Sequence, residues 1–185
     1  PVLRDPSNWI YAKEDAGKML VGCFEPKSKP RPLETIPEDF SFGQFPEDWD
    51  HFEPAMLNAI HRIPKLEDAG IQTFFNGPES FTPDDRYILG EAPELKNFYV
   101  AAGFNSIGIQ SAGGAGKALS EWIVNGHPPL DLWGVDIRRF HPFQINASYL
   151  KERTEETLGL LYAMHWPFQQ PETSRGVRKS VLHDR

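Results

Sequence analysis

The sequence has little cysteine and little positive charge. Its single cysteine, Cys23, cannot form an internal disulfide or a zinc site, which is typical of a reducing compartment. The 19 Lys and Arg residues are outnumbered by 26 Asp and Glu residues, so the net charge is -7. Because no cationic surface is available to neutralise a phosphate backbone, nucleic acid is excluded as an expected partner.

Long hydrophobic runs are also missing. The longest, at 98–104 and 158–164, are far shorter than the roughly 20 residues that cross a bilayer, and no signal-peptide pattern opens the chain. We therefore expect neither a membrane span nor a signal peptide. The chain starts at Pro1 and stops at Arg185 without a closing element, so we expect a piece of a longer protein. Its 39% apolar and 12% aromatic residues suffice for a folded core.

Proline and glycine are abundant, with 17 and 15 residues in a chain of 185. Such a composition predicts much loop structure. A hairpin is predicted over 9–24, with its turn at Gly17. The proline-rich stretch 25–46 indicates either a flexible linker or an ordered loop, the latter held by Phe40, Phe42 and Phe45.

The rest of the chain alternates between strand and helix patterns. Apolar steps of three and four from Trp49 to Ile63 predict a helix, which we expect to begin at Pro54 after a short turn. The other predicted elements are strands at 71–75, 87–90 and 98–102 and helices at 108–124 and 147–164. The strand at 98–102 is apolar throughout, so we expect it to be buried on both faces. The fold class is therefore α/β, or mixed α+β.

The most informative segment is a strand, a glycine-containing turn and a helix over residues 98–117. Gly103 and Gly108 allow the backbone to approach a flat ligand, and the unpaired amides and positive end of the following helix favour negative charge. A dinucleotide-binding fingerprint fails because position 119 is Leu119, and a phosphate-binding loop fails because position 111 is Ser111. The further glycines at 113, 114 and 116 equally fit close helix packing alone.

Other polar residues carry weaker signals. The six histidines form no short ligand pair, so no metal site is predicted. We expect Asp84 to cap backbone amides in a turn. Arg138 and Arg139 are expected to anchor acidic partners in preference to a substrate carboxylate. Charged side chains are predicted to be solvated at Lys117 and at Lys151, Glu152, Arg153, Glu155 and Glu156.

Several longer strings together resemble the sarcosine dehydrogenase and dimethylglycine dehydrogenase family. The resemblance covers nearly the whole chain. The strings are Asn76–Asp84 (Asn-Gly-Pro-Glu-Ser-Phe-Thr-Pro-Asp), Gly90–Leu95 (Gly-Glu-Ala-Pro-Glu-Leu), Gly103–Gly108 (Gly-Phe-Asn-Ser-Ile-Gly) and Asp136–Phe140 (Asp-Ile-Arg-Arg-Phe), supported by Leu3–Pro6 and Val21–Pro26.

The resemblance implies a D-amino-acid-oxidase-like flavoprotein fold. It assigns 1–97 to an antiparallel substrate-binding domain, 98–145 to the last strand and helix of the FAD domain, and 146–185 to a helix and connector toward a downstream region that uses tetrahydrofolate. The implied FAD contacts are Gly103, Phe104, Asn105, Ser106, Ile107, Gly108 and Ile109. The family's glycine fingerprint for ADP and its flavin-linked histidine are expected upstream, so this chain alone should hold FAD weakly. No catalytic residue is nominated.

The activity implied by the resemblance is oxidative N-demethylation of sarcosine or dimethylglycine, within one-carbon metabolism. An electron-transfer flavoprotein or a similar acceptor would take the electrons. The compartment would be the mitochondrial matrix in a eukaryote and the cytoplasm in a bacterium. A regulatory subunit of pyruvate dehydrogenase phosphatase carries related strings and remains the alternative, as does a truncated domain without activity of its own.

Overall fold

The computed structural model describes residues 1–162 and 171–173. These residues form two compact units. The first unit comprises residues 1–78 and 158–162, and the second unit comprises residues 79–157 and 171–173. This division follows packing within the chain. The assignment of 1–97, 98–145 and 146–185 to parts of a larger flavoprotein stays a prediction.

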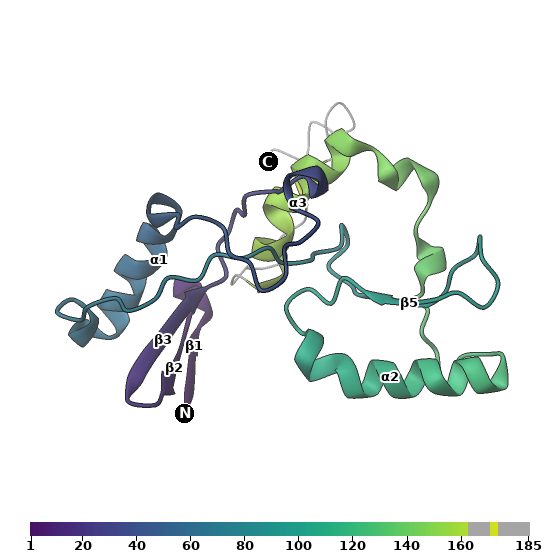
Figure 1. Ribbon diagram of the computed structural model, residues 1–185, viewed down its shortest axis with the longest axis horizontal. Coiled ribbons are helices and arrows are strands. Elements are labelled where there is room, and N and C mark those ends of the chain that lie inside the picture. Colours follow the sequence, from purple (N-terminus) through teal and green to yellow (C-terminus); the bar gives the residue numbers. More distant parts are fainter. Residues whose placement is uncertain (163–170, 174–185) are drawn as a thin grey trace, which may run out of the picture. The chain divides into compact units, whose positions relative to one another are not determined.

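An antiparallel sheet opens the first unit, with strands β1 (Val2–Asp5), β2 (Ile10–Asp15) and β3 (Lys18–Cys23) in the order β1-β2-β3 (Figure 1). The predicted hairpin at 9–24 is confirmed. Ala16 and Gly17 form its turn with φ of 50° and 79°, a two-residue geometry whose twist matches that of the strands. Sequence reasoning did not predict β1.

Helix α1 (Trp49–Arg62) packs against this sheet. It begins before Pro54, so the predicted start at Pro54 is wrong. Because Pro54 has no N–H, one carbonyl in the preceding turn of α1 lacks a helical donor. The Pro54 side chain is exposed, so water can reach that carbonyl. Burial of Ala55 and Ala59 against Ile10 outweighs that one missing hydrogen bond.

The proline-rich stretch 25–46 is an irregular segment with one short 3-10 helix, η2 (Leu33–Thr35). Phe40 and Phe45 stack with ring centroids 5.2 Å apart, and the Arg31 guanidinium lies 4.4 Å from the Phe45 ring centroid. Phe42 is fully exposed, so the expectation that it holds the loop is wrong.

The predicted strand at 71–75 is also wrong, because these residues form no regular structure. The Phe74 ring instead contacts Trp49 and Phe52 on α1, at centroid distances of 4.4 and 5.5 Å. Two aromatic contacts with one helix therefore replace the strand pairing that the apolar pattern suggested.

The second unit contains an antiparallel pair, β4 (Ile88–Glu91) and β5 (Tyr99–Ala102), with α2 (Gly108–Asn125) beside it (Figure 1). These elements confirm the predicted strands at 87–90 and 98–102 and the helix at 108–124. Gly126, with φ of 74°, ends α2. The core of this unit is Leu89, Ala115 and Ala118.

Two details of the second unit correct the sequence expectations. Ala101 and Ala102 are exposed, because β5 pairs only with β4 among the described residues; the expected burial of β5 on both faces is wrong. Helix α3 (Ala147–Tyr162) confirms the predicted helix as far as the description extends, while residues 163–164 and most of the expected connector lie outside it. Its Arg153 and Glu156 side chains are largely buried, so their predicted solvation is wrong.

The fold class is confirmed as a mixture of helices and antiparallel sheets. Short 3-10 helices complete it at η1 (Pro6–Asn8), η3 (Pro64–Leu66), η4 (Ile137–Arg139) and η5 (Pro142–Ile145). Within the described ranges, no helix combines the length and apolar character that a membrane crossing requires.

Candidate functional site

The turn between β5 and α2 has an unusual backbone. Gly103, Asn105 and Ser106 all adopt positive φ, at 61°, 50° and 70°. A Cβ atom at Gly103 would lie 2.5 Å from Cγ2 of Thr82. The chain's own conformation and packing therefore require glycine at position 103, whether or not a ligand approaches it.

The start of α2 has open hydrogen-bond donors. Its N-cap residue, Ile107, makes no side-chain cap, and the first turn contains no acidic residue. Among the described residues, the amides of Gly108, Ile109 and Gln110 meet no recorded acceptor. Ile109 is fully exposed, so these donors and the positive end of an 18-residue helix are available to a negatively charged group.

Gly108 differs from Gly103. A Cβ atom at Gly108 would meet only Cβ of Phe104, at 3.6 Å, which is an ordinary contact. Nothing in the described chain therefore requires glycine at this position. Close approach of a ligand remains a sufficient reason for it.

The seven residues predicted to contact FAD lie together but face different ways. The Phe104 ring stacks on Tyr87 at 5.0 Å between centroids, and Asn105 is only 2% exposed. Ser106 and Ile109 are exposed and Gly108 is half-buried. The side chains of Phe104 and Asn105 are thus committed to the fold, and the outward surface consists mainly of backbone from 106 to 110.

The side chain of Asn105 is bonded to Thr82, a partner that sequence reasoning did not identify. Asn105 Oδ1 accepts from the Thr82 amide at 2.8 Å, and Asn105 Nδ2 donates to Thr82 Oγ1 at 3.2 Å. Thr82 is 4% exposed. The sequence held one indication of this role: Asn105 follows closely on Gly103 at the end of a strand, and asparagine tolerates a left-handed backbone.

The two arginines of η4 anchor this region, which confirms their predicted role. Arg139 Nε and Nη2 donate to the Asp84 carboxylate at 2.6 and 3.1 Å. Arg138 Nε and Nη2 donate to the carboxylate of Asp136, which is 6% exposed. Burial alone would raise the pKa of Asp136, but the hydrogen bonds from Arg138 outweigh it and lower that pKa. The predicted capping by Asp84 is confirmed by its bond from the Arg86 amide.

A second charged cluster joins the 82–86 turn to α3. The Arg153 guanidinium donates to Glu156 at 3.0 Å, and Glu156 also accepts hydrogen bonds from the amides of Glu172 and Thr173. Burial, with a smaller contribution from Asp84 and Glu156, raises the pKa of Asp85 to about 7 although Arg153 opposes the shift. Lys117 pairs with Glu121 and is largely exposed, as predicted.

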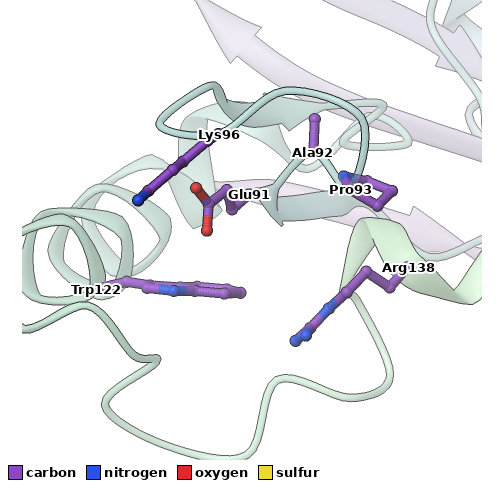
Figure 2. A pocket seen from close by; sticks show the side chains of 6 residues that line it. All are labelled: Glu91, Ala92, Pro93, Lys96, Trp122 and Arg138. Atoms are coloured by element: carbon purple, nitrogen blue, oxygen red, sulfur yellow. The ribbon is translucent and has the colours of Figure 1, made fainter.

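A shallow cavity of about 300 Å³ lies at the other end of α2 and is lined by Glu91, Ala92, Pro93, Lys96, Trp122 and Arg138. Figure 2 shows the charged side chains arranged around the space beside the Trp122 ring. Two of the Arg138 nitrogens are already bonded to Asp136. This cavity is separated along α2 from the open amides, and no group of three potential metal ligands occurs within the described ranges.

Comparison with protein families places the site in context. The FAD dependent oxidoreductase family matches residues 1–122, which is more than half of the chain, and the FAD dependent oxidoreductase central domain matches residues 125–180. The chain belongs to the FAD-dependent oxidoreductase family. This confirms the family recognised from the sequence strings.

The relatives of this oxidoreductase chain include enzymes of N-methyl amine oxidation. A 4-methylaminobutanoate oxidase (formaldehyde-forming) from Paenarthrobacter nicotinovorans is 51% identical over 100% of this chain and 22% of its own length. Mitochondrial sarcosine dehydrogenase from Mus musculus is 38% identical over 100% of this chain and 20% of its own length. The mitochondrial pyruvate dehydrogenase phosphatase regulatory subunit from Mus musculus is also 38% identical, over 100% of this chain and 21% of its own length. The chain thus spans about a fifth of the relatives it matches.

The geometry of the turn fits the cofactor of this family. A flavin becomes more negative on reduction, and the start of α2 offers open amides, a helix dipole and a first turn without an acidic residue. The half-buried Gly108 leaves its amide unobstructed by a side chain. These features satisfy the donor chemistry expected of one edge of a flavin site.

Proposed function

We propose that this chain is part of an FAD-dependent oxidoreductase that removes an N-methyl group from a small amino acid. Sarcosine, dimethylglycine and 4-methylaminobutanoate are the candidate substrates. The proposal is supported by the family match and by the open amides of Gly108, Ile109 and Gln110. The related 4-methylaminobutanoate oxidase, sarcosine dehydrogenase and dimethylglycine dehydrogenase act on this class of amine.

In this proposal the start of α2 holds the edge of the flavin that gains negative charge. The oxidising chemistry would come from bound FAD, which can accept a hydride equivalent from the N-methyl carbon. The amides of residues 108–110 donate hydrogen bonds toward the developing charge, and the α2 dipole adds to their effect. Because the Thr82–Asn105 hydrogen bonds already hold the turn, these donors need little reorganisation during the reaction.

Four finer elements of the proposal come from the resemblance. Formaldehyde-level carbon would pass to tetrahydrofolate in another part of the protein. Electrons would leave to an electron-transfer flavoprotein or a similar acceptor. The isolated chain would hold FAD weakly. The compartment would be the mitochondrial matrix in a eukaryote and the cytoplasm in a bacterium, in keeping with the mitochondrial and bacterial relatives.

A non-catalytic regulatory role is the second candidate, because the phosphatase regulatory subunit is as similar to this chain as sarcosine dehydrogenase is. Anaerobic addition of substrate to the full-length protein separates the two functions. We expect sarcosine, dimethylglycine or 4-methylaminobutanoate to bleach the visible flavin absorption, while glycine and 4-aminobutanoate, which lack the N-methyl group, leave it unchanged. A protein without flavin, or with flavin that none of the three amines reduces, would favour the regulatory role.

A further inference from the structure

Thr82 and Asn105 form a buried polar pair, which we call the Thr82–Asn105 clamp. Besides the hydrogen bonds that join the two residues, the Thr82 hydroxyl donates to the Arg86 carbonyl at 2.8 Å. The backbone N–H of Asn105 donates to the Ser80 carbonyl at 3.3 Å. The clamp therefore joins two segments that lie 23 residues apart, without leaving the Thr82 hydroxyl unpaired.

The clamp controls the turn at both of its ends. The Thr82 methyl group fills the space where a Cβ of Gly103 would lie, so it packs directly on the backbone that leaves β5. Asn105, held at φ of 50°, determines the direction in which the chain enters α2. Since α2 begins three residues later, a rotation at Asn105 changes where the amides of 108–110 point.

The other side of the clamp is fixed to the rest of the second unit. Arg139 binds both the Asp84 carboxylate and the Arg86 carbonyl, and its Nη1 donates to the carbonyls of Val135 and Asp136. Residue 136 bridges to β4 at Leu89. The hydrogen bonds therefore run without interruption from β4 through Arg139 and Thr82 to the turn before α2.

We infer that Thr82 and Asn105 are positioning residues of the flavin site: they set the direction of the open amides at the start of α2 and so tune how strongly the reduced flavin is favoured. This inference rests on the proposed function. In this role neither side chain needs to touch FAD or substrate, because both act through the backbone of residues 103–110. Networks of satisfied buried hydrogen bonds are well suited to this role because they specify one geometry.

The test compares two buried threonines in the full-length holoprotein. Thr82→Val keeps the side-chain shape but removes the hydroxyl that Asn105 and Arg86 use. Thr157→Val is the matched control, because Thr157 is 2% exposed and its hydroxyl donates to the Thr154 carbonyl within α3, not to the clamp. Both changes remove one buried hydroxyl, so both should lower the melting temperature, and Thr82→Val by more because Asn105 Nδ2 loses its Thr82 acceptor.

The deciding measurement is the midpoint potential of the flavin. We expect Thr82→Val to lower it by about 30 mV, which equals a tenfold weaker preference for the reduced form of a two-electron couple. Thr82→Ser, which retains the hydroxyl, should restore most of the potential, and Thr157→Val should leave it unchanged. An unchanged potential in Thr82→Val, or an equal shift in Thr157→Val, would overturn the inference.

Two further experiments test the inference if the first variant does not fold or if the protein holds no flavin. If Thr82→Val does not fold, Asn105→Gly removes the clamp from its other side, without backbone strain, because it deletes the Asn105 bonds to the Thr82 amide and hydroxyl; it must also lower the potential. If the full-length wild-type protein holds no flavin, the proposed function fails, and amide hydrogen exchange decides whether the clamp exists. Exchange at residues 103–110 must then rise in Thr82→Val and not in Thr157→Val; equal exchange in both would refute the clamp.

Discussion

The two units differ in what they bury. The first unit has an apolar core in which Ile10 packs against Ala55 and Ala59. Among the described residues, all the buried polar side chains, namely Thr82, Asn105, Asp136 and Thr157, belong to the second unit. Apolar burial alone holds elements together, whereas buried hydrogen bonds also fix their direction.

One ion pair from each unit illustrates the same difference. In the first unit, the pair between Lys29 and Asp48 leaves 60% and 33% of the side chains exposed. In the second unit, the pair between Arg139 and Asp84 leaves 12% and 34% exposed, and Arg139 also binds carbonyl groups. The unit that carries the candidate flavin-facing helix is therefore the one with a specified polar interior.

The largest expected effect tests whether that interior supports a site. In the full-length holoprotein, Gly108→Val should slow flavin reduction by substrate about a hundredfold, or ~3 kcal/mol, because the side chain would separate the α2 amides from the flavin edge. Folding should be little affected, since an added Cβ meets only an ordinary contact. Stopped-flow reduction and thermal unfolding measure the two effects.

Two glycine variants serve as controls for this prediction. Gly103→Val should destabilise the protein, because Gly103 has positive φ and faces Thr82. Gly113→Ala should neither slow flavin reduction nor lower the stability of the fold, because a Cβ there meets nothing within 4 Å. Reduction of Gly108→Val at the wild-type rate would show that the turn is packing alone.

The second prediction compares the ion pairs directly. Arg139→Met should destabilise the full chain by about 3 kcal/mol, since it removes a guanidinium that is only 12% exposed and that binds both the Asp84 carboxylate and the carbonyls of residues 86, 135 and 136. Lys29→Met should cost at most about 1 kcal/mol, because the Lys29 side chain is 60% exposed and its charge is screened by water. Chemical denaturation of both variants measures the difference, and equal losses would contradict the contrast between the units.

The third prediction concerns close backbone packing in the first unit. A Cβ at Gly159 would overlap the carbonyl oxygen of Pro26, and that backbone cannot move as easily as a side chain. Gly159→Ala should therefore destabilise the protein by about 2 kcal/mol despite the better helix propensity of alanine. Gly116→Ala in α2, where a Cβ meets nothing within 4 Å, is the control and should stabilise by about 0.5 to 1 kcal/mol. A stable Gly159→Ala protein would show that α3 is not held against Pro26.

The smallest expected effect is the pH dependence of Asp85. Its pKa in the folded chain is about 7, against 3.8 for an ordinary carboxyl, so the folded state holds the proton more tightly than the unfolded state. The free energy of unfolding should therefore fall as pH rises from about 4 to 7. Asp85→Asn should remove this loss and be more stable than wild type above pH 7, by about 1 kcal/mol after allowing for the partial exposure of the group.

Thermal unfolding between pH 4 and 8 tests this sign. Arg153 faces Asp85 and favours its charged form, while Asp84 and Glu156 oppose it. The pKa of Asp136 is lowered in the folded chain, so its contribution to the free energy of unfolding has the opposite pH dependence: that stabilisation is lost as pH falls. Asp84→Asn serves as a comparison: it removes a charge that raises the pKa of Asp85 and, at the same time, the salt bridge to Arg139. A wild-type protein and an Asp85→Asn variant with parallel pH profiles would contradict the prediction.

Local patterns in the sequence were sufficient for several elements. The hairpin at 9–24 follows from a glycine turn between two strand patterns, and α2 follows from helical periodicity that ends at Asn125 and Gly126. The arginine anchors followed from the chemistry of Arg138 and Arg139. Local patterns misplaced the start of α1 at Pro54, because the benefit of burying Ala55 against Ile10 cannot be read from neighbouring residues.

The sequence by itself determined the family, the glycine turn at 103–108 and the helix that follows, because these depend on residue identity at short spacing. Only the tertiary structure decided that Gly103 serves the chain's own packing while Gly108 does not, and that Asn105 is bonded to Thr82. It also decided that Arg153 and Glu156 lie inside the unit. The physical reason is that burial and hydrogen-bond partners arise from residues far apart in the chain, so no local pattern encodes them.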